Sequence, residues 1–394
     1  MISREADKMF IPLNPINING HAIDFSDQAE HVGIIRSCNG NMPNLVNRFT
    51  SHRKALAASL PCGTARSHRA NLAACLSVEK LYALPVLMSG LASLVLSNTE
   101  INHLDQHYLN TLRRLLKLHE GTPHPFVYFL SGSLPGRAYL HLRQISLFTM
   151  ISSLPNNPLN IRAKHVLTKL SPTSKSWFSQ IRDIFLLYGL PHPLSVLAFP
   201  PPKNKFKSLA KSLVTDYWEK KLRQDMSALP SLKYFRAEFS SLCSPHPITW
   251  TPASNPYEVT KAVVQAKMLS GRYRTAKLTS HWTNKGSDCQ APGCTGATET
   301  LEHILVSCPY YADIRERLVN LWISIPDPTV KMLALSVLTG PSQQLVSFIL
   351  DASSHPLVIK AGKNLLSAVF YLTRTWCYSI HRKRAKLLCM YSFD

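Results

Sequence analysis

Apolar and polar residues alternate at strand spacing only near the start of this chain, and elsewhere the apolar residues recur at helical spacing. Ile16-Asn17-Ile18 alternates, Asn19-Gly20 follows, and a second short run covers Ala22 to Phe25. Asn-Gly between two such runs is a strong signal for a two-residue hairpin turn. We therefore predict a short β-hairpin there and a further strand over residues 31–35, which is too little sheet for a separate domain.

Helical spacing begins soon after this hairpin. Proline is tolerated in the first turn of a helix, so Pro43 marks a helix start. Leu45, Phe49 and Leu56 then fall on one face, which predicts a buried stripe. Another helix is predicted over residues 137–154.

The helix after residue 97 has a distinct start signal, because Ser97 is followed three residues later by Glu100 as a capping box. Behind it, apolar residues recur at spacings of three and four: Ile101, Leu104, Tyr108, Leu112 and Leu115. Arg113, Arg114 and Lys117 fall largely off this stripe. These basic residues form either a solvated face or a surface that contacts phosphate.

The longest uncharged run, residues 81–98, contains Pro85 and Gly90. It is marginal in length for a bilayer span and is broken near its start, so we interpret it as a buried helix with a turn. The first fifteen residues lack the basic-then-apolar pattern of a secretory signal peptide. We expect no membrane partner.

Residues 155–255 are less regular and contain two proline-rich stretches, 190–193 and 199–202. The second runs into Lys203-Asn-Lys205-Phe-Lys207, which we interpret as a charged, extended linker in preference to a dedicated nucleic-acid site. A helix is predicted over residues 208–226, and Cys243 with His246 is predicted to be structural.

Two further helices are predicted, over residues 257–278 with a break near Gly271 and over residues 358–388. The second ends in His381-Arg-Lys-Arg384 and Lys386. Basic residues suit the C-terminal end of a helix dipole, while a nucleic-acid contact and a nuclear-import signal are alternative explanations. The fold class is therefore predicted to be mainly α.

Charge and cysteine content narrow the choice of partner and compartment. The 394 residues include 44 Lys+Arg against 23 Asp+Glu, a formal net charge of +21. Such an excess favours a polyanionic partner, usually RNA or DNA. Nine cysteines are too few for a disulfide scaffold; three of them cluster with a histidine, and the others are scattered. This pattern suits a reducing, intracellular compartment, nuclear or cytoplasmic, and one metal site.

That cluster reads C-x4-C-x8-H-x4-C, from Cys289 and Cys294 to His303 and Cys308. Three thiols and one imidazole are the ligands of a closed tetrahedral zinc site, and four protein ligands make the ion structural. Glycines 293 and 296 give the loop freedom to wrap around an ion, and Thr298 is placed to cap a helix over residues 299–306 that carries His303.

Basic and aromatic residues flank the predicted zinc site. Arg272, Tyr273, Arg274 and Lys277 precede it, together with Lys285. Aromatic rings beside such a knuckle either stack on unpaired bases or pack around a small core. The two readings stay equal for Tyr273, and packing is favoured for Trp282.

Residues 289–322, CQAPGCTGATETLEHILVSCPYYADIRERLVNLW, resemble the Cys-Cys-His-Cys segment that follows the reverse transcriptase domain in non-LTR (LINE-type) retrotransposon polyproteins. Residues 29–34 resemble the strand near the primer grip of the polymerase palm. The resemblance to the helical thumb and to the region beyond it covers residues 44–60, 69–90, 104–118, 122–123, 132–135 and 140–143. Residues 372–377 resemble the tail of such reading frames.

The resemblance implies five segments: a palm or primer-grip remnant with the β-hairpin (1–40), a helical thumb-like domain (41–155), a basic proline-containing linker region with helices (156–254), a zinc-knuckle domain (255–325) and C-terminal helices with a basic end (326–394). Reverse transcriptases hold two metal ions on a Tyr/Phe-x-Asp-Asp turn. This sequence contains no Asp-Asp pair, and the resemblance implies that the turn would lie upstream of Met1.

We therefore expect a nucleic-acid-binding C-terminal portion of a reverse transcriptase that is inactive alone. RNA or DNA, and the upstream catalytic part of the same element, are the expected partners. One alternative is an enzyme, either a nuclease that uses Asp327 or Asp351 or the accessory half of an active polymerase. The other is a decayed gene product without a selected function.

Overall fold

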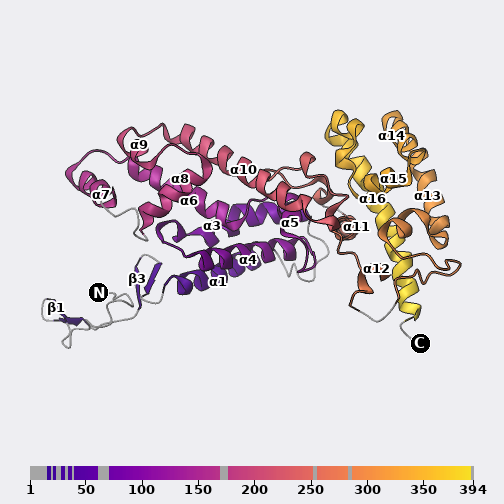
Figure 1. Cartoon of the computed structure of the whole chain (residues 1–394), viewed down its shortest axis with the longest axis horizontal. Helices are drawn as coiled ribbons and strands as arrows, with labels where there is room; N and C mark the ends of the chain where they lie inside the picture. The colour runs from indigo at the N-terminus through magenta and orange to yellow at the C-terminus, as the bar shows by residue number, and fades with distance from the viewer. Residues whose placement is uncertain are drawn as a thin grey trace. The chain divides into compact units, whose positions relative to one another are not determined.

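A computed structural model of the chain confirms a mainly α-helical protein with little sheet (Figure 1). The structure describes residues 16–18, 21–23, 28–31, 34–37, 40–60, 71–168, 176–251, 255–282 and 286–391. Within these residues, no helix combines the length and the apolar character that crossing a bilayer requires.

The predicted β-hairpin is present as two antiparallel strands, β1 (Ile16–Ile18) and β2 (His21–Ile23). Ile18 pairs with His21, which leaves two residues for the turn; the turn residues themselves, Asn19 and Gly20, lie outside the described residues. The single further strand predicted over residues 31–35 is wrong in its bounds. Two antiparallel strands occur instead, β3 (Gln28–His31) and β4 (Ile34–Ser37).

The chain forms two compact units, each assembled from separated stretches of sequence. The first comprises residues 1–61, 78–109 and 134–218, and the second comprises residues 62–77, 110–133 and 219–394. This division cuts across the five segments expected from the sequence, whose boundaries stay a prediction.

Helices and helical turns dominate the first unit. They are α1 (Met42–Ser59), η2 (Glu79–Ala83), α3 (Leu84–Met88), η3 (Leu91–Ser93), α4 (Asn98–Leu115), α6 (Gly136–Ser152), α7 (Pro158–Thr168), α8 (Trp177–Tyr188), α9 (Pro193–Ala198) and α10 (Lys203–Ser227). The unit boundary falls within α4 after Leu109 and within α10 after Trp218. The uncharged run at 81–98 is helical but interrupted, since Gly90 adopts a left-handed φ of 75° after α3.

The capping box that starts α4 is confirmed. The Ser97 amide donates to Glu100 Oε2 at 2.7 Å, and the Glu100 amide donates to Ser97 Oγ at 3.3 Å. Glu100 Oε1 also accepts from the Asn41 amide at 2.7 Å, so one carboxylate fixes the starts of both α4 and α1. Behind this cap, Leu104 and Tyr108 are completely buried.

The interpretation of residues 203–207 as an extended linker is wrong. Lys203, Lys205 and Lys207 lie in the first turns of α10, which begins five residues before the predicted start at 208. Pro202 precedes this start, where a proline is compatible with the helix because the first amide groups have no intrahelical acceptor. The prolines therefore mark a helix boundary.

The second unit is built from the remaining helices. They are α2 (Leu72–Val78), α5 (His124–Ser131), η4 (Pro230–Leu232), η5 (Ala237–Phe239), η6 (Pro247–Thr249), α11 (Pro256–Leu269), α12 (Ala276–Thr279), η7 (His303–Ser307), η8 (Pro309–Tyr311), α13 (Ala312–Ile323), α14 (Pro328–Leu338), α15 (Ser342–Leu350), η9 (Ala352–Ser354) and α16 (Pro356–Tyr391). The long C-terminal helix predicted over residues 358–388 is confirmed as α16.

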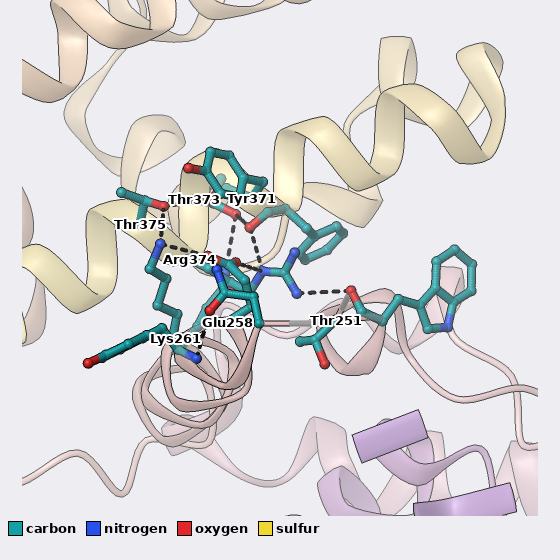
Figure 2. Close-up of polar contacts among 12 residues, drawn as sticks. Thr251, Glu258, Lys261, Tyr371, Thr373, Arg374 and Thr375 are labelled. Atoms are coloured by element: carbon teal, nitrogen blue, oxygen red, sulfur yellow. Dashed lines mark hydrogen bonds and ion pairs between the residues drawn. The ribbon is translucent and has the colours of Figure 1, made fainter. Parts of the chain in front are cut away.

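A buried ion pair joins α16 to α11 (Figure 2). Arg374 Nε lies 3.9 Å from Glu258 Oε2, and both side chains are 2% exposed. Arg374 NH1 also donates to the Trp250 carbonyl oxygen at 3.0 Å. Burial lowers the pKa of Arg374, and the Glu258 charge offsets part of this effect. An ion pair this deep is costly to break, because Arg374 without Glu258 would be an unpaired buried charge, and Glu258 without Arg374 would keep only Lys261.

Further polar contacts extend this network along the two helices (Figure 2). Lys261 donates to Glu258 Oε1 at 2.7 Å and to Thr375 Oγ1 at 3.2 Å. Gln265 Nε2 donates to Thr373 Oγ1 at 3.1 Å and to the Ile349 carbonyl oxygen at 2.8 Å. The network fixes the register of α11, α15 and α16 within the unit.

His246 has a structural role, as the sequence predicts. Its Nε2 atom lies 3.4 Å from Asp351 Oδ1 and 3.3 Å from Ser353 Oγ, and all three side chains are buried. The cluster anchors η6 to η9. Cys243, three residues earlier, is exposed and forms no disulfide bond.

The Arg374 ion pair predicts a specific loss of stability. Arg374→Met should lower the free energy of unfolding by about 3 kcal/mol, because Glu258 is left buried without its guanidinium. Urea denaturation monitored by circular dichroism measures the effect, with Arg382→Met on the same helix as an exposed control. The double variant Glu258→Gln/Arg374→Met should recover part of the loss. Equal unfolding midpoints for the two single variants would contradict this assignment.

Candidate metal centre

The loop that carries the first two cysteines is closed by backbone pairing. Asp288 and Thr298 form an isolated antiparallel bridge. The Cys289 amide donates to the Ala297 carbonyl oxygen at 2.8 Å, and the Glu299 amide donates to the Ser287 carbonyl oxygen at 2.8 Å. This short hairpin holds the backbone on both sides of the loop and thereby brings Cys289 and Cys294 close together.

Two glycines shape the loop by conformation. Gly293 and Gly296 have φ values of 76° and 74°, in the left-handed region that disfavours other residues. A Cβ atom on either would meet nothing within 4 Å. Backbone geometry therefore accounts for both glycines, as the sequence predicts.

The third and fourth ligands come from an irregular helical turn. The Thr300 hydroxyl accepts from the His303 amide at 3.1 Å, and residues 303–307 form the π-helical turn η7. The Cys308 amide donates to the His303 carbonyl oxygen at 2.7 Å, which ends the turn. The predicted short helix that carries His303 is therefore present, but it starts at residue 301 in place of 299, because Thr298 belongs to the hairpin, and Thr300 in place of Thr298 accepts the capping hydrogen bond.

The four predicted ligands converge. One ligand atom from each of Cys289, Cys294, His303 and Cys308 lies within 4.8 Å of all the others. Cys289 Sγ is 3.9 Å from Cys308 Sγ, and Cys294 Sγ is 3.2 Å from His303 Nε2. Zn–S bonds of about 2.3 Å in a tetrahedron imply a sulfur–sulfur separation of roughly 3.8 Å. The cluster can thus hold a metal ion, and its donor set fits zinc.

Burial controls the protonation of these ligands. It raises the pKa of Cys289 to about 12 and also raises that of Cys308. It lowers the pKa of His303, which favours the neutral imidazole that a metal requires. The half-buried Arg315 guanidinium interacts electrostatically with Cys308, and its NH1 atom has no hydrogen-bond partner among the described residues. Arg315 supplies positive charge behind a cluster that becomes anionic when three thiolates bind a divalent ion.

Two contacts from α16 support the cluster. Arg384 NH2 donates to Glu299 Oε1 at 2.6 Å, and both side chains are buried. The same Glu299 oxygen accepts from the Ala276 amide at 2.7 Å, which ties α12 to the ligand loop. Trp376 Nε1 donates to the Leu305 carbonyl oxygen at 3.2 Å within η7. The ligand geometry therefore depends on where α16 lies.

The basic residues predicted on α4 belong to the same unit as the metal cluster. Arg114 is exposed, and Arg113 is half-buried with its NH1 atom 3.1 Å from Asn110 Oδ1. Lys117 lies two residues beyond the end of α4 and has a left-handed φ of 54°. Among the described residues, none of the three forms an ion pair with a carboxylate.

The predicted basic residues near the metal cluster lie close to these. A Cβ atom on Gly121 would be 3.8 Å from Arg272 Cζ, so Arg272 lies against the loop that follows α4. Lys267, at the end of α11, interacts electrostatically with Lys117. The sequence did not single out Lys267, because its place on a mostly buried helix resembles that of a core-flanking lysine. Residues 113–117 and 267–277 together form what we call the basic surface.

Of the aromatic residues near the metal cluster, Tyr273 packs in the structure and Trp282 is exposed, which differs from the sequence expectation. The Tyr273 hydroxyl lies 2.9 Å from His381 Nδ1, and the Arg384 guanidinium lies 5.5 Å from the centre of its ring, so Tyr273 packs on α16. Packing was favoured for Trp282, and this is wrong, since its side chain is 66% exposed. Arg274 and Lys277 are exposed as well, whereas Lys285 lies outside the described residues.

The acidic residues considered for a nuclease have other contacts. Asp351 is completely buried against His246 and Ser353. Asp327 caps α14, where its carboxylate accepts from the Thr329 and Val330 amides. Within the described residues, the Cys-His cluster is the one group of possible metal ligands that converges.

Zinc content gives the first test of the cluster. Protein purified without chelator should contain about one zinc per chain, and His303→Ala should lose it, because three thiolates alone do not close a tetrahedral site. Elemental analysis measures the ratio, with His281→Ala as an exposed control outside the cluster. Chelator should lower the unfolding temperature of the parent and of the control. A ratio well below one in the parent would count against the site.

Proton release gives a second test. Because burial raises the thiol pKa of Cys289 and Cys308, both thiols are protonated near neutral pH without metal. Zinc binding must then release their protons, so the zinc affinity should fall as the pH falls. Calorimetry in buffers of different ionisation enthalpy measures the released protons. Zinc binding without proton release would show that the thiols are not the ligands.

Comparison with known proteins adds no further constraint to this geometry. No family model, no curated protein and no solved structure matches the chain. Among the described residues, the Cys-His cluster is a group that could hold a metal ion.

Proposed function

We propose that the second unit binds RNA or DNA through the basic surface, with a structural zinc ion in the Cys-His cluster. The observation that carries this proposal is the meeting of two basic segments that are far apart in the sequence. Arg272 lies beside the loop after α4, and Lys117 interacts with Lys267. The sequence makes each segment a separate candidate for nucleic-acid contact: the basic residues within 113–117 fall largely off the apolar stripe of a helix, and those within 272–277 precede the predicted zinc site.

Charge supports a polyanionic ligand at this surface. Seven cationic residues contribute to it, and no ion pair to a carboxylate is found for any of them among the described residues: Arg113, Arg114, Lys117, Lys267, Arg272, Arg274 and Lys277. Burial lowers the pKa of Lys117, and the neighbouring Lys267 lowers it further. Like charges held together repel each other, and phosphate groups would relieve this repulsion while releasing counterions.

Exposed aromatic surface favours unpaired nucleotides as the ligand. Trp282 follows α12 directly and is 66% exposed. An indole ring in water provides a face on which any base can stack, which gives affinity with little sequence preference. The preceding helix turn, with Lys277, is tied to the ligand loop by the Ala276 amide. The metal cluster would thus hold the stacking ring and the nearby cations in one place.

The proposed ion is structural because four protein ligands leave no open position for a substrate. We propose further that the chain corresponds to the C-terminal portion of a LINE-type reverse transcriptase, on the ordered resemblance of its segments. It would then grip template RNA or target DNA beside an upstream catalytic part. The absence of any Asp-Asp pair supports a binding role for this chain.

Salt dependence tests the proposal directly. Binding of the full chain to a labelled single-stranded RNA should weaken steeply with salt, with a log–log slope near −0.7 per phosphate contact, roughly. Arg272→Ala should reduce the magnitude of that slope by about the contribution of one contact. Lys331→Ala, an exposed lysine of α14 in the same unit, is the matched control and should leave the slope unchanged. A flat salt response, or no binding at low salt, would refute the proposal.

A further inference from the structure

A groove lies between α13 and α16, which pack against each other in the second unit. It has a volume of about 640 Å³ and is lined on the α13 side by Ile314, Leu318 and Leu321. These three residues follow the i, i+4, i+7 spacing of one helical face. Ile314 and Leu318 are buried, whereas Leu321 is 40% exposed. The groove therefore has an aliphatic floor that is open to solvent at one end.

The rim of this groove is basic. Arg317 contributes from α13, and Arg382, Lys383 and Lys386 contribute from α16 at i, i+1 and i+4. One carboxylate opposes them, since Asp313 lies 2.6 Å from Lys383 Nζ and 3.4 Å from Arg317 NH2. Lys383 lowers the pKa of Asp313, so this carboxylate stays charged at neutral pH. Four cations and one anion leave the rim with a net positive charge.

Arg382 and Lys386 are the cations available to a ligand. Both are exposed, and neither forms an ion pair within the part of the chain that the structure describes. They lie one helical turn apart, so their charges point along the same edge of α16. A ligand that matches the groove must therefore bring an apolar face to the floor and negative charge to this edge.

We propose that the groove between α13 and α16 docks an acidic amphipathic helix of a protein partner. An amphipathic helix lays apolar side chains at i, i+3, i+4 and i+7 into such a groove, and its Asp and Glu residues would face Arg382 and Lys386. Burial of Leu321 would remove an exposed aliphatic side chain from water.

Nucleic acid fits this groove less well than it fits the basic surface. Phosphates would use the rim cations, but no aromatic side chain is among the described residues that line the groove, and Lys383 Nζ lies 4.4 Å from the centre of the nearby Tyr310 ring. The exposed Leu321 would stay uncovered, and Ser379 is the one neutral polar side chain of the lining. The residues of the groove are not those of the basic surface, so this proposal stands or fails separately from the proposed function.

A peptide-binding experiment with the full chain tests the groove. The probe is a fluorescent peptide of about 16 residues, roughly 24 Å of helix, with leucines on one face and glutamates elsewhere. A scrambled peptide of the same composition, with the leucines dispersed, controls for charge attraction alone. Fluorescence anisotropy should show the amphipathic peptide binding at least about tenfold more tightly than the scrambled peptide.

Variants at exposed positions locate the binding. Arg382→Glu, Lys386→Glu and Leu321→Ser should each weaken the amphipathic peptide by about tenfold, while Lys331→Glu on α14 should have no effect. Circular dichroism melts should match the parent, because all four side chains are exposed.

Three results would overturn the proposal. The first is equal affinity of the chain for the two peptides. The second is a loss of peptide affinity in the Lys331→Glu control as large as in the groove variants. The third is that the groove variants still bind the peptide but no longer bind a single-stranded oligonucleotide or phosphatidylserine vesicles.

Discussion

The second unit depends on the position of α16, which a buried ion pair determines. Arg374 is buried beside Glu258, which also holds Lys261, and the guanidinium without this carboxylate would be strongly destabilised in the interior. Once this pair is formed, the register of α16 places Trp376 against the carbonyl oxygen of Leu305 and Arg384 against Glu299. The same helix presents another edge to the groove with α13. One ion pair thereby positions a metal cluster and a separate groove.

The features that the sequence predicted well are those set by neighbouring residues. The capping box at Ser97 and Glu100 and the left-handed glycines of the ligand loop depend on local geometry, and the structure has both. The four ligands also converge, because ligand type and spacing constrain a short loop strongly. The cofactor's identity, the parent family and the segment boundaries stay predictions.

Features set by tertiary packing could not be predicted. The ring of Tyr273 packs on α16 because residues more than 100 positions downstream reach it. Trp282 resembles a core residue in the sequence, yet it is 66% exposed. The electrostatic interaction of Lys117 with Lys267 depends on the path of the chain between them, which no local pattern encodes. Local sequence patterns therefore identified the candidate metal ligands, whereas only the tertiary structure shows which other residues lie near them.

The proposed function requires that nucleic acid contacts the basic surface and Trp282. Photo-crosslinking of a thiouridine-containing single-stranded RNA to the full chain, followed by peptide mass spectrometry, maps this contact most directly. We expect crosslinks within residues 113–117 and 267–282, with a crosslink at Trp282 that Trp282→Ala removes. Crosslinks confined to the lysine-rich start of α10, or to the groove between α13 and α16, would contradict it.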